Sequence, residues 1–232
     1  TLDEMKSDFT NNITHELKTP IAITYAATDA LLNFNIIDNK NKREKYLRIC
    51  MEQLQRLSGL VEQILSMSME QRKTFRLNPE TIQMKELADN LIEQHKIKAD
   101  KPVSFTLSVE PEELTINADR AHTYNILSNL LDNAVKYSPD KADVSIFIED
   151  EGNELSVKVT DKGIGIAPEK QTHIFDKFYR VPTGNLHNVK GFGLGLFYVR
   201  TLTEKMGGSI EAKSALGKGS TFILKLPQHE NN

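Results

Sequence analysis

The sequence predicts a two-domain protein in which a helical hairpin precedes a layered α+β domain. Residues 1–74 contain a single proline, Pro20, and a single glycine, Gly59, which is a helical composition. From residue 75 onward, short segments alternate apolar and polar residues with the period of two that half-buried strands show. Helical segments lie among these strands without strict alternation, which favours helices on one face of a mixed sheet.

Composition narrows the class of protein. The chain has 232 residues, of which 39% are hydrophobic and 26% charged, so it can build a globular core. Its formal charge of -3 argues against a general nucleic-acid binder. A single cysteine, Cys50, excludes an intramolecular disulfide and a Cys-rich zinc site. The chain starts at Thr1 without an initiator methionine, so we expect a piece of a longer protein whose membrane anchor, if present, lies upstream.

The first segment is expected to form two antiparallel helices. Apolar residues recur every four positions from Met5 to Leu17, which marks one stripe of a helix. Residues 35–41 are polar and rich in asparagine, which indicates a turn. A second helix then shows spacings that alternate between four and three residues, which is a heptad seam. The seam consists of Tyr46, Cys50, Gln53, Leu57, Leu60, Ile64 and Met67.

Two helices alone give little burial for two apolar stripes. We therefore expect residues 1–74 to pair with a second copy as a dimeric four-helix bundle. Residues 75–232 form the second predicted domain.

The second domain is expected to contain at least four strands and three helices. The loop at 151–153 should join two of the strands as a hairpin, and Asp119 is a plausible N-cap for one helix. The predicted strands are 103–109, 144–148, 155–159 and 221–226, and the predicted helices are 84–100, 119–136 and 194–206.

Two asparagines lie on one predicted helix of this domain. Asn129 and Asn133 are four residues apart and share a face with the later Lys136 and Tyr137. An amide oxygen is a hard, neutral ligand that suits Mg²⁺ when phosphates supply the negative charge. The structural alternative is a buried cap or a hydrogen bond between helices.

Two further segments carry closely spaced glycines. Asp161, Gly163 and Gly165 directly follow a strand, where a carboxylate could accept a hydrogen bond from an adenine amine. The two glycines would let the backbone approach a flat ligand, although a simple turn after a strand explains the same residues.

Gly191, Gly193 and Gly195 open a helix, where free N–H groups and the helix dipole suit phosphates. They follow a loop and fit neither the Rossmann nor the P-loop pattern. A mobile glycine hinge is the alternative, and both interpretations can hold together.

The remaining candidates surround these motifs. Aromatic anchors and cations beside a flexible loop suit a lid over phosphates. Thr221 stands in a glycine-rich segment before the last strand, which a turn into that strand would also explain. The lid candidates are Phe175, Phe178, Arg180 and Lys190.

Taken in order, these motifs resemble the N, G1, F and G2 boxes of bacterial sensor histidine kinases. Their ATP-binding domain belongs to the superfamily of gyrase, Hsp90, histidine kinases and MutL (GHKL), which implies an α+β sandwich of the Bergerat type. The resemblance implies that Asn133 binds Mg²⁺ beside Asn129, and that Tyr137 and Asp161 hold the adenine of ATP. It also implies that phosphates contact Lys136, Arg180 and Lys190.

The first domain carries the matching phosphoacceptor motif. A lone helical histidine is usually structural or exposed, but residues 15–20 resemble the H box of the same family. Neutral imidazole can attack phosphorus, and Glu16 could hold its other N–H or accept a proton. Thr19 lies on the same helix face as His15, and in the family this position orients a water that dephosphorylates the regulator.

The resemblance therefore implies a protein histidine kinase, a phosphotransferase active in two-component signal transduction. ATP would phosphorylate His15, which would pass the group to an Asp in the receiver domain of a response regulator, and a regulator phosphatase activity is expected too. The expected assembly is a homodimer through residues 1–74, without nucleic acid. We expect the cytoplasmic portion of a cell-membrane sensor, in contact with the membrane only through a missing upstream region.

Two rival functions belong to other classes. One is a degenerate ATP-binding module that only docks partners, which the intact His15, Asn133 and Asp161 argue against. The other is a hydrolysing ATPase or chaperone of the same superfamily. The H box argues against it, as does Asn129 at the place where the hydrolases usually carry a glutamate.

Overall fold

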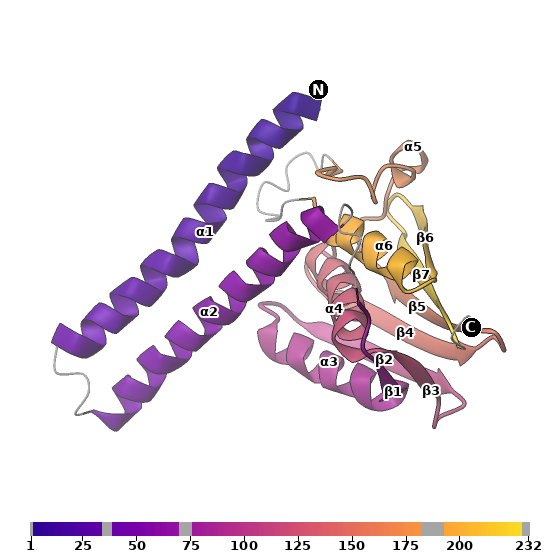
Figure 1. Cartoon of the computed structure of the whole chain (residues 1–232), viewed down its shortest axis with the longest axis horizontal. Helices are drawn as coiled ribbons and strands as arrows, with labels where there is room; N and C mark the ends of the chain where they lie inside the picture. The colour runs from indigo at the N-terminus through magenta and orange to yellow at the C-terminus, as the bar shows by residue number, and fades with distance from the viewer. Residues whose placement is uncertain (1, 34–38, 70–75, 182–192, 229–232) are drawn as a thin grey trace. The chain divides into compact units, whose positions relative to one another are not determined.

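The computed structural model describes residues 2–33, 39–69, 76–181 and 193–228. The chain divides into two compact units, Thr1–Lys73 and Thr74–Asn232, which are described separately below (Figure 1). Most of the predicted turn at 35–41 falls outside the described residues, as do Lys190 and Gly191.

The first unit is a pair of long helices, α1 (Leu2–Asn33) and α2 (Lys40–Met69), which confirms the predicted helical hairpin. The α1 helix continues through Pro20, whose carbonyl accepts a hydrogen bond of 2.8 Å from Thr24 Oγ1. In the described part of the chain, neither these helices nor any other is both long and apolar enough to cross a membrane.

The described residues of the predicted α2 seam are half-buried or buried, whereas a second apolar stripe on α2 is exposed to solvent. In the seam, Cys50 is half-buried and Leu60 is buried. Next to them, large apolar side chains are spaced four, three and seven residues apart, with exposed fractions of 43–60%. This exposed stripe consists of Leu47, Met51, Leu54 and Val61.

The second unit is built on a five-stranded mixed sheet with the order β2-β4-β5-β7-β6. The β2–β4 pair is parallel and the other three pairs are antiparallel. A separate antiparallel pair joins β1 (Pro79–Gln83) to β3 (Thr115–Asp119). The strands of the large sheet are β2 (Val103–Glu110), β4 (Ala142–Asp150), β5 (Glu154–Asp161), β6 (Ser209–Ala215) and β7 (Gly219–Pro227).

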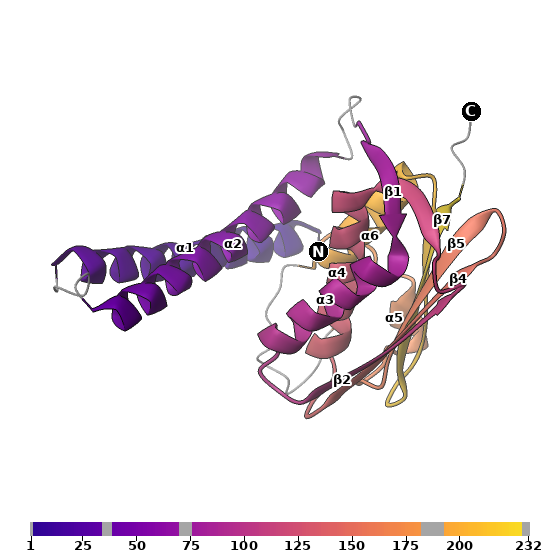
Figure 2. The ribbon, with the colours of Figure 1, turned by 90° about the horizontal axis from the view of Figure 1, so that it is seen from below.

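The helices α3 (Met84–Lys98), α4 (Arg120–Lys136) and α6 (Gly195–Lys205) lie on one face of this sheet (Figure 2). The α4 helix begins as predicted, because Asp119 Oδ1 accepts a hydrogen bond of 3.0 Å from His122 N. Buried side chains such as Leu130 of α4, Val157 of β5 and Leu224 of β7 fill the layer between helices and sheet. The predicted fold of helices on one face of a mixed sheet is thereby confirmed.

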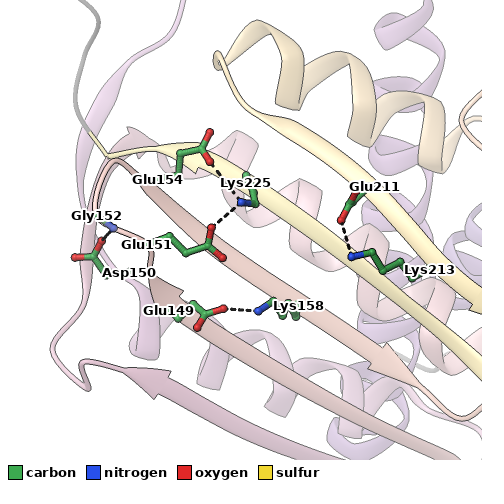
Figure 3. Close-up of polar contacts among 9 residues, drawn as sticks. All are labelled: Glu149, Asp150, Glu151, Gly152, Glu154, Lys158, Glu211, Lys213 and Lys225. Carbon is green, nitrogen blue, oxygen red and sulfur yellow. Dashed lines mark hydrogen bonds and ion pairs between the residues drawn. The ribbon is translucent and has the colours of Figure 1, made fainter.

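The opposite face of the sheet carries charges that pair with one another (Figure 3). Lys158 pairs with Glu149, and Lys213 lies 3.3 Å from Glu211. Lys225 pairs with Glu151 at 2.6 Å and also reaches Glu154. Such half-exposed pairs contribute little stability, and they mark this face as the solvent side of the sheet.

A histidine connects α3 to α4. His95 is 6% exposed, its Nδ1 lies 2.7 Å from the Leu91 carbonyl oxygen, and its Nε2 lies 3.3 Å from Asp132 Oδ1. Asp132 also accepts a hydrogen bond of 3.0 Å from Lys98 Nζ. Burial alone would lower the pKa of His95, but the contacts with Asp132 and with the Leu91 carbonyl outweigh it, so the pKa is raised.

This geometry predicts a pH-dependent stability. Because the pKa of His95 is raised above its ordinary value of 6.5, its contribution is complete below that pH and is lost as pH rises through the folded-state pKa. The urea concentration at the midpoint of unfolding should therefore decrease as the pH is raised from 6 to 8. His95→Gln should make this decrease smaller. His173→Gln, at an exposed histidine, should keep the wild-type slope. Equal slopes in all three proteins would contradict the assignment.

Candidate functional site

A partly open pocket lies in the second unit, among residues of α4, β5, β7 and the segments beside them. It brings together five of the residues predicted from the sequence: Asn133, Tyr137, Asp161, Gly165 and Arg180. The other lining residues are mostly apolar: Ile164, Ile166, Ile174, Tyr179, Val181, Leu196, Ser220 and Phe222.

Asp161 is the buried carboxylate of this pocket. It ends β5 and is 5% exposed. Its Oδ1 accepts two backbone hydrogen bonds, from Gly163 N at 2.8 Å and from Ser220 N at 3.2 Å. Burial raises the pKa of Asp161, and the two amides oppose this rise. The carboxylate is therefore held in one orientation by two different segments.

The loop after Asp161 depends on glycine. Gly165 has φ +65°, and a Cβ there would lie 2.0 Å from the Ala215 carbonyl oxygen. Backbone bonds fix this loop on both sides, because Ile164 N donates to the Tyr137 carbonyl (3.1 Å) and Gly217 N donates to the Ile164 carbonyl (2.7 Å). The loop is thus packed between the end of α4 and the β6–β7 turn.

The α4 helix supplies the amides. Asn133 lines the pocket, while Asn129 Nδ2 donates to the Asn125 carbonyl at 2.9 Å. The Asn129 Oδ1 atom faces the start of α6, where a Cβ on Gly195 would lie 3.1 Å from it. Among the described residues, no group of three or more His, Cys, Asp or Glu could hold a metal ion. Of the two predicted amides, Asn133 is the one that lines the pocket.

Tyr137 follows the end of α4. Its N–H donates to the Asn133 carbonyl at 3.0 Å, and Lys136 Nζ lies 5.2 Å from the centre of its ring. Burial raises the pKa of Tyr137, and the charge of Arg180 opposes this rise. The Arg180 guanidinium thus lies close enough to the Tyr137 hydroxyl for its charge to affect the Tyr137 pKa.

The predicted lid residues separate into two groups. Arg180 lines the pocket, whereas Phe175 is buried and packs edge-on against Phe222, with 6.4 Å between ring centres. Phe178, with φ +68°, donates its N–H to the Gly193 carbonyl at 3.1 Å. The two phenylalanines therefore position the segment through packing and backbone contacts.

Thr221 lies on the other face of the sheet from Asp161. Its Oγ1 is 2.9 Å from Thr160 Oγ1, in a pair directly next to the Asp161–Ser220 pair. Because side chains alternate along a strand, Thr221 points away while Ser220 and Phe222 line the pocket. Neither Ser220 nor Phe222 is among the site residues predicted from the sequence. The period-two pattern of this strand could have found them once its register with β5 was known.

In the first unit, His15 is exposed on α1. Thr19 is exposed one turn later, and its Oγ1 donates to the His15 carbonyl at 3.1 Å. The imidazole is thus accessible to solvent, and the two predicted residues share a face of the helix. The Glu16 side chain lies outside the described part of the structure.

Comparisons with known proteins identify the class. Residues 118–230 match the family described as histidine kinase-, DNA gyrase B- and HSP90-like ATPase. Residues 5–73 match the His kinase A phospho-acceptor domain. The chain therefore belongs to the sensor histidine kinases, as the motifs predict, and its fold is the phosphoacceptor hairpin followed by the GHKL-type domain.

Individual relatives agree with this class. The chain is 38% identical over 234 residues to sensor protein RprX of Bacteroides fragilis (strain YCH46), covering 100% of this chain and 45% of RprX. The structure of the histidine kinase AdeS of Acinetobacter baumannii matches at a TM-score of 0.60 and 25% identity, over 94% of this chain and 98% of that one.

Histidine kinase ThkA, solved in complex with response regulator protein TrrA, matches at a TM-score of 0.63 and 25% identity, over 97% of this chain and 63% of that one. The chain is also 33% identical to sensor protein SrrB of Staphylococcus aureus (strain MRSA252), over 99% of this chain and 39% of SrrB. It therefore spans less than half the length of these two sensor proteins.

The close approach at Gly165 leads to a stability prediction. Gly165→Ala forces both a strained φ and a clash with the Ala215 carbonyl, whereas Gly152→Ala at φ +88° meets no atom within 4 Å. Gly152→Ala should therefore cost about 1–2 kcal/mol, from strain alone. Gly165→Ala should lower the free energy of unfolding by clearly more than this, as measured by chemical denaturation. Equal losses would show that the loop can move away from the β6–β7 turn.

Proposed function

We propose that this chain is the catalytic core of a sensor histidine kinase, which transfers the γ-phosphoryl group of ATP to His15. The observation that carries the proposal is the Asp161 carboxylate, buried and held by two backbone amides in a pocket that also contains Asn133, Tyr137 and Arg180. The exposed histidine of a matching phosphoacceptor domain supplies the nucleophile.

The pocket suits ATP at both ends. Asp161 can accept a hydrogen bond from the adenine amine, and Ile164, Ile166 and Phe222 give the base apolar contacts. Arg180 lines the same pocket and can contact phosphates, with Lys136, Lys190 and the glycines before α6 as further candidates.

Mg²⁺ would bind through the Asn133 amide oxygen together with phosphate oxygens, which fits a hard-cation site with few protein ligands. When bound, the cation would neutralise charge on the phosphates. Asn129 would hold a water or orient the neighbouring amide.

The chemistry asks little of the protein beyond a nucleophile and positioning. A bond forms between an imidazole nitrogen of His15 and the γ-phosphorus while the bond to the β-phosphate bridging oxygen breaks, and ADP leaves. Glu16 is the adjacent group that could hold the other ring N–H or take up its proton. The phosphoryl group would then pass to a carboxylate of a response regulator.

Free hydrolysis of ATP is less well supported. An amide side chain such as Asn129 cannot act as a general base, and its Nδ2 donates to the backbone of its own helix. The residue that stands where superfamily hydrolases usually have a glutamate therefore cannot activate water. Phosphotransfer to histidine is the activity that remains compatible with the site.

The assembly we propose is a homodimer through residues 1–74. The exposed stripe of Leu47, Met51, Leu54 and Val61 follows heptad spacing along α2 and would be covered in a four-helix bundle. ThkA was solved with a response regulator, which supports a receiver domain as the second partner. The longer relatives are called sensor proteins, which supports a cytoplasmic portion of a membrane sensor.

The central test is autophosphorylation with γ-labelled ATP. His15→Gln should bind ADP with unchanged affinity in calorimetry but take up no acid-labile, base-stable label, because only the nucleophile is lost. Asn133→Ala should instead lose Mg²⁺-dependent affinity and, with it, labelling. Label retained on the His15→Gln protein would refute His15 as the acceptor.

A second test concerns the proposed phosphatase activity. The Thr19 hydroxyl uses its proton toward the His15 carbonyl, so its oxygen remains available to accept a hydrogen bond from an attacking water. Thr19→Ala should slow dephosphorylation of the regulator about tenfold, as expected for the loss of one hydrogen bond to the attacking water, while autophosphorylation stays within about twofold.

Thr28→Ala is the matched control, since Thr28 makes the same type of hydrogen bond one turn back, to the Thr24 carbonyl. It should change neither activity. An equal loss of kinase and phosphatase rates in Thr19→Ala would argue against the proposed role.

A further inference from the structure

The two edges of the large sheet differ in charge. One edge is β2 and the other is β6. Natural proteins discourage pairing at a sheet edge with charged side chains, proline or a bulge. β6 follows this rule, because Glu211 and Lys213 stand near its middle. β2 does not follow it, since residues 103–109 contain neither a charged residue nor a proline.

The β2 edge is also poorly covered. None of its residues is buried, and the positions that alternate with the exposed ones are only half-buried. On the neighbouring strand β4, the corresponding residues Val144 and Ile146 are buried. In the described part of the chain no strand lies beyond β2, so the backbone groups that point away from β4 lack a strand partner. The edge therefore offers both hydrogen-bonding groups and apolar surface to a further strand.

The sequence of β2 reads almost the same in both directions. From 103 to 109 it is Val-Ser-Phe-Thr-Leu-Ser-Val, with Thr106 at the centre. When two copies pair as antiparallel strands about a two-fold axis at Thr106, each residue faces the one equally far from the centre. Ser104 then faces Ser108 of the second copy, and Phe105 faces Leu107. A symmetric pair thus matches like with like at every position.

The two faces of the joined sheet match as well. The odd-numbered residues of 103–109 are apolar and half-buried, and the even-numbered ones are exposed hydroxyl residues. A two-fold axis perpendicular to the sheet places the helix-covered faces of both copies on the same side. Apolar side chains then meet on that side and hydroxyls meet on the other, and both kinds of cross-strand pair are favourable. Pro102 and Pro111 flank the strand and, without an N–H, limit the pairing to it.

We propose that β2 is a self-pairing edge, through which the second units of two chains join as antiparallel strands into one continuous sheet. The occupant is a second copy of this chain, because a strand of another protein has no need of the symmetry about Thr106. This interface is separate from the proposed dimer through residues 1–74, and the two together link dimers into a larger assembly. It needs no nucleotide, so it is independent of the proposed phosphotransfer.

An edge that is merely solvated would also have exposed hydroxyls. In that case copies meet only by random collision, and cysteines at different positions of β2 cross-link with similar yields. A self-paired edge instead has a strict register, in which opposite Cα atoms lie about 4.5–5.5 Å apart, within reach of a disulfide. Equivalent residues two positions from the centre are separated by about 13 Å along the strand, which is beyond that reach.

The experiment places single cysteines in the 232-residue Cys50→Ser protein, oxidises them in a glutathione buffer and analyses the products on non-reducing denaturing gels. Thr106→Cys should form disulfide-linked dimers with itself, because it lies on the two-fold axis. Ser145→Cys is the matched control, since Ser145 is the exposed neighbour of Thr106 on β4 and lies one strand further from the axis in each copy. It should remain uncross-linked.

A mixing experiment tests the register. Ser104→Cys should not cross-link to itself, but it should cross-link to Ser108→Cys when the two proteins are mixed, with a tag on one of them to identify the mixed product. Adding Thr106→Lys to both proteins places like charges opposite each other and should abolish this product. Adding Thr106→Val, which keeps a β-branched side chain, should preserve it.

Three outcomes would overturn the proposal. Equal yields for Thr106→Cys and Ser145→Cys would show that the edge has no symmetric partner. Ser104→Cys that cross-links to itself as readily as to Ser108→Cys would show random collision. If no β2 cysteine cross-links in the purified protein, a second copy is not the occupant, and the edge is left to a strand of another protein.

Discussion

The second unit depends on how it accommodates one buried charge. Asp161 is almost without solvent, and burial by itself disfavours the ionised carboxyl. Backbone amides of Gly163 and Ser220 offset part of this effect, and these residues come from segments far apart in the sequence. The geometry of the loop, of the start of β7 and of the pocket wall all follow from the need to bring these two amides to one oxygen atom.

This constraint also explains where glycine is required. A Cβ on Gly219 would lie 2.0 Å from the Asp161 carbonyl oxygen, and one on Gly163 would lie 2.9 Å from the carboxylate. Side chains at either position would push the amides away from the charge. The Asp161 carboxylate is therefore fixed in orientation before any ligand binds, and fixed polar groups of this kind contribute most to binding and catalysis. His15, in contrast, is exposed, as our proposal requires of a nucleophile that would meet two different reactants in turn.

Much of this organisation could be predicted from the sequence, and the gaps have physical reasons. The long helices, four strands and the cap at Asp119 were predictable because apolar periodicity and capping are local properties. β6 is harder to predict because, as an edge strand, its less exposed positions hold mostly small residues, with Ile210 as the one large apolar side chain. The sequence motif around Asp161 is local, whereas Ser220 is brought beside it by the pairing of β7 with β5, which no local pattern encodes. For the same reason the sequence predicts Thr221 as a site residue, whereas the pocket is lined by its neighbour Ser220.

The parallel pairing of β2 with β4 affects how the protein can acquire its function as it is synthesised. Parallel neighbours need a long crossover, and here the crossover contains β3 and α4, the helix that carries Asn133. The Asp161 carboxylate on β5 accepts one of its two backbone hydrogen bonds from Ser220, which follows 59 residues later in the chain. An emerging chain therefore contains the helix with Asn133 and the strand with Asp161 well before the pocket between them is complete. Because β7 lies between β5 and β6 and follows both in the chain, the pocket cannot be complete until this strand has been synthesised.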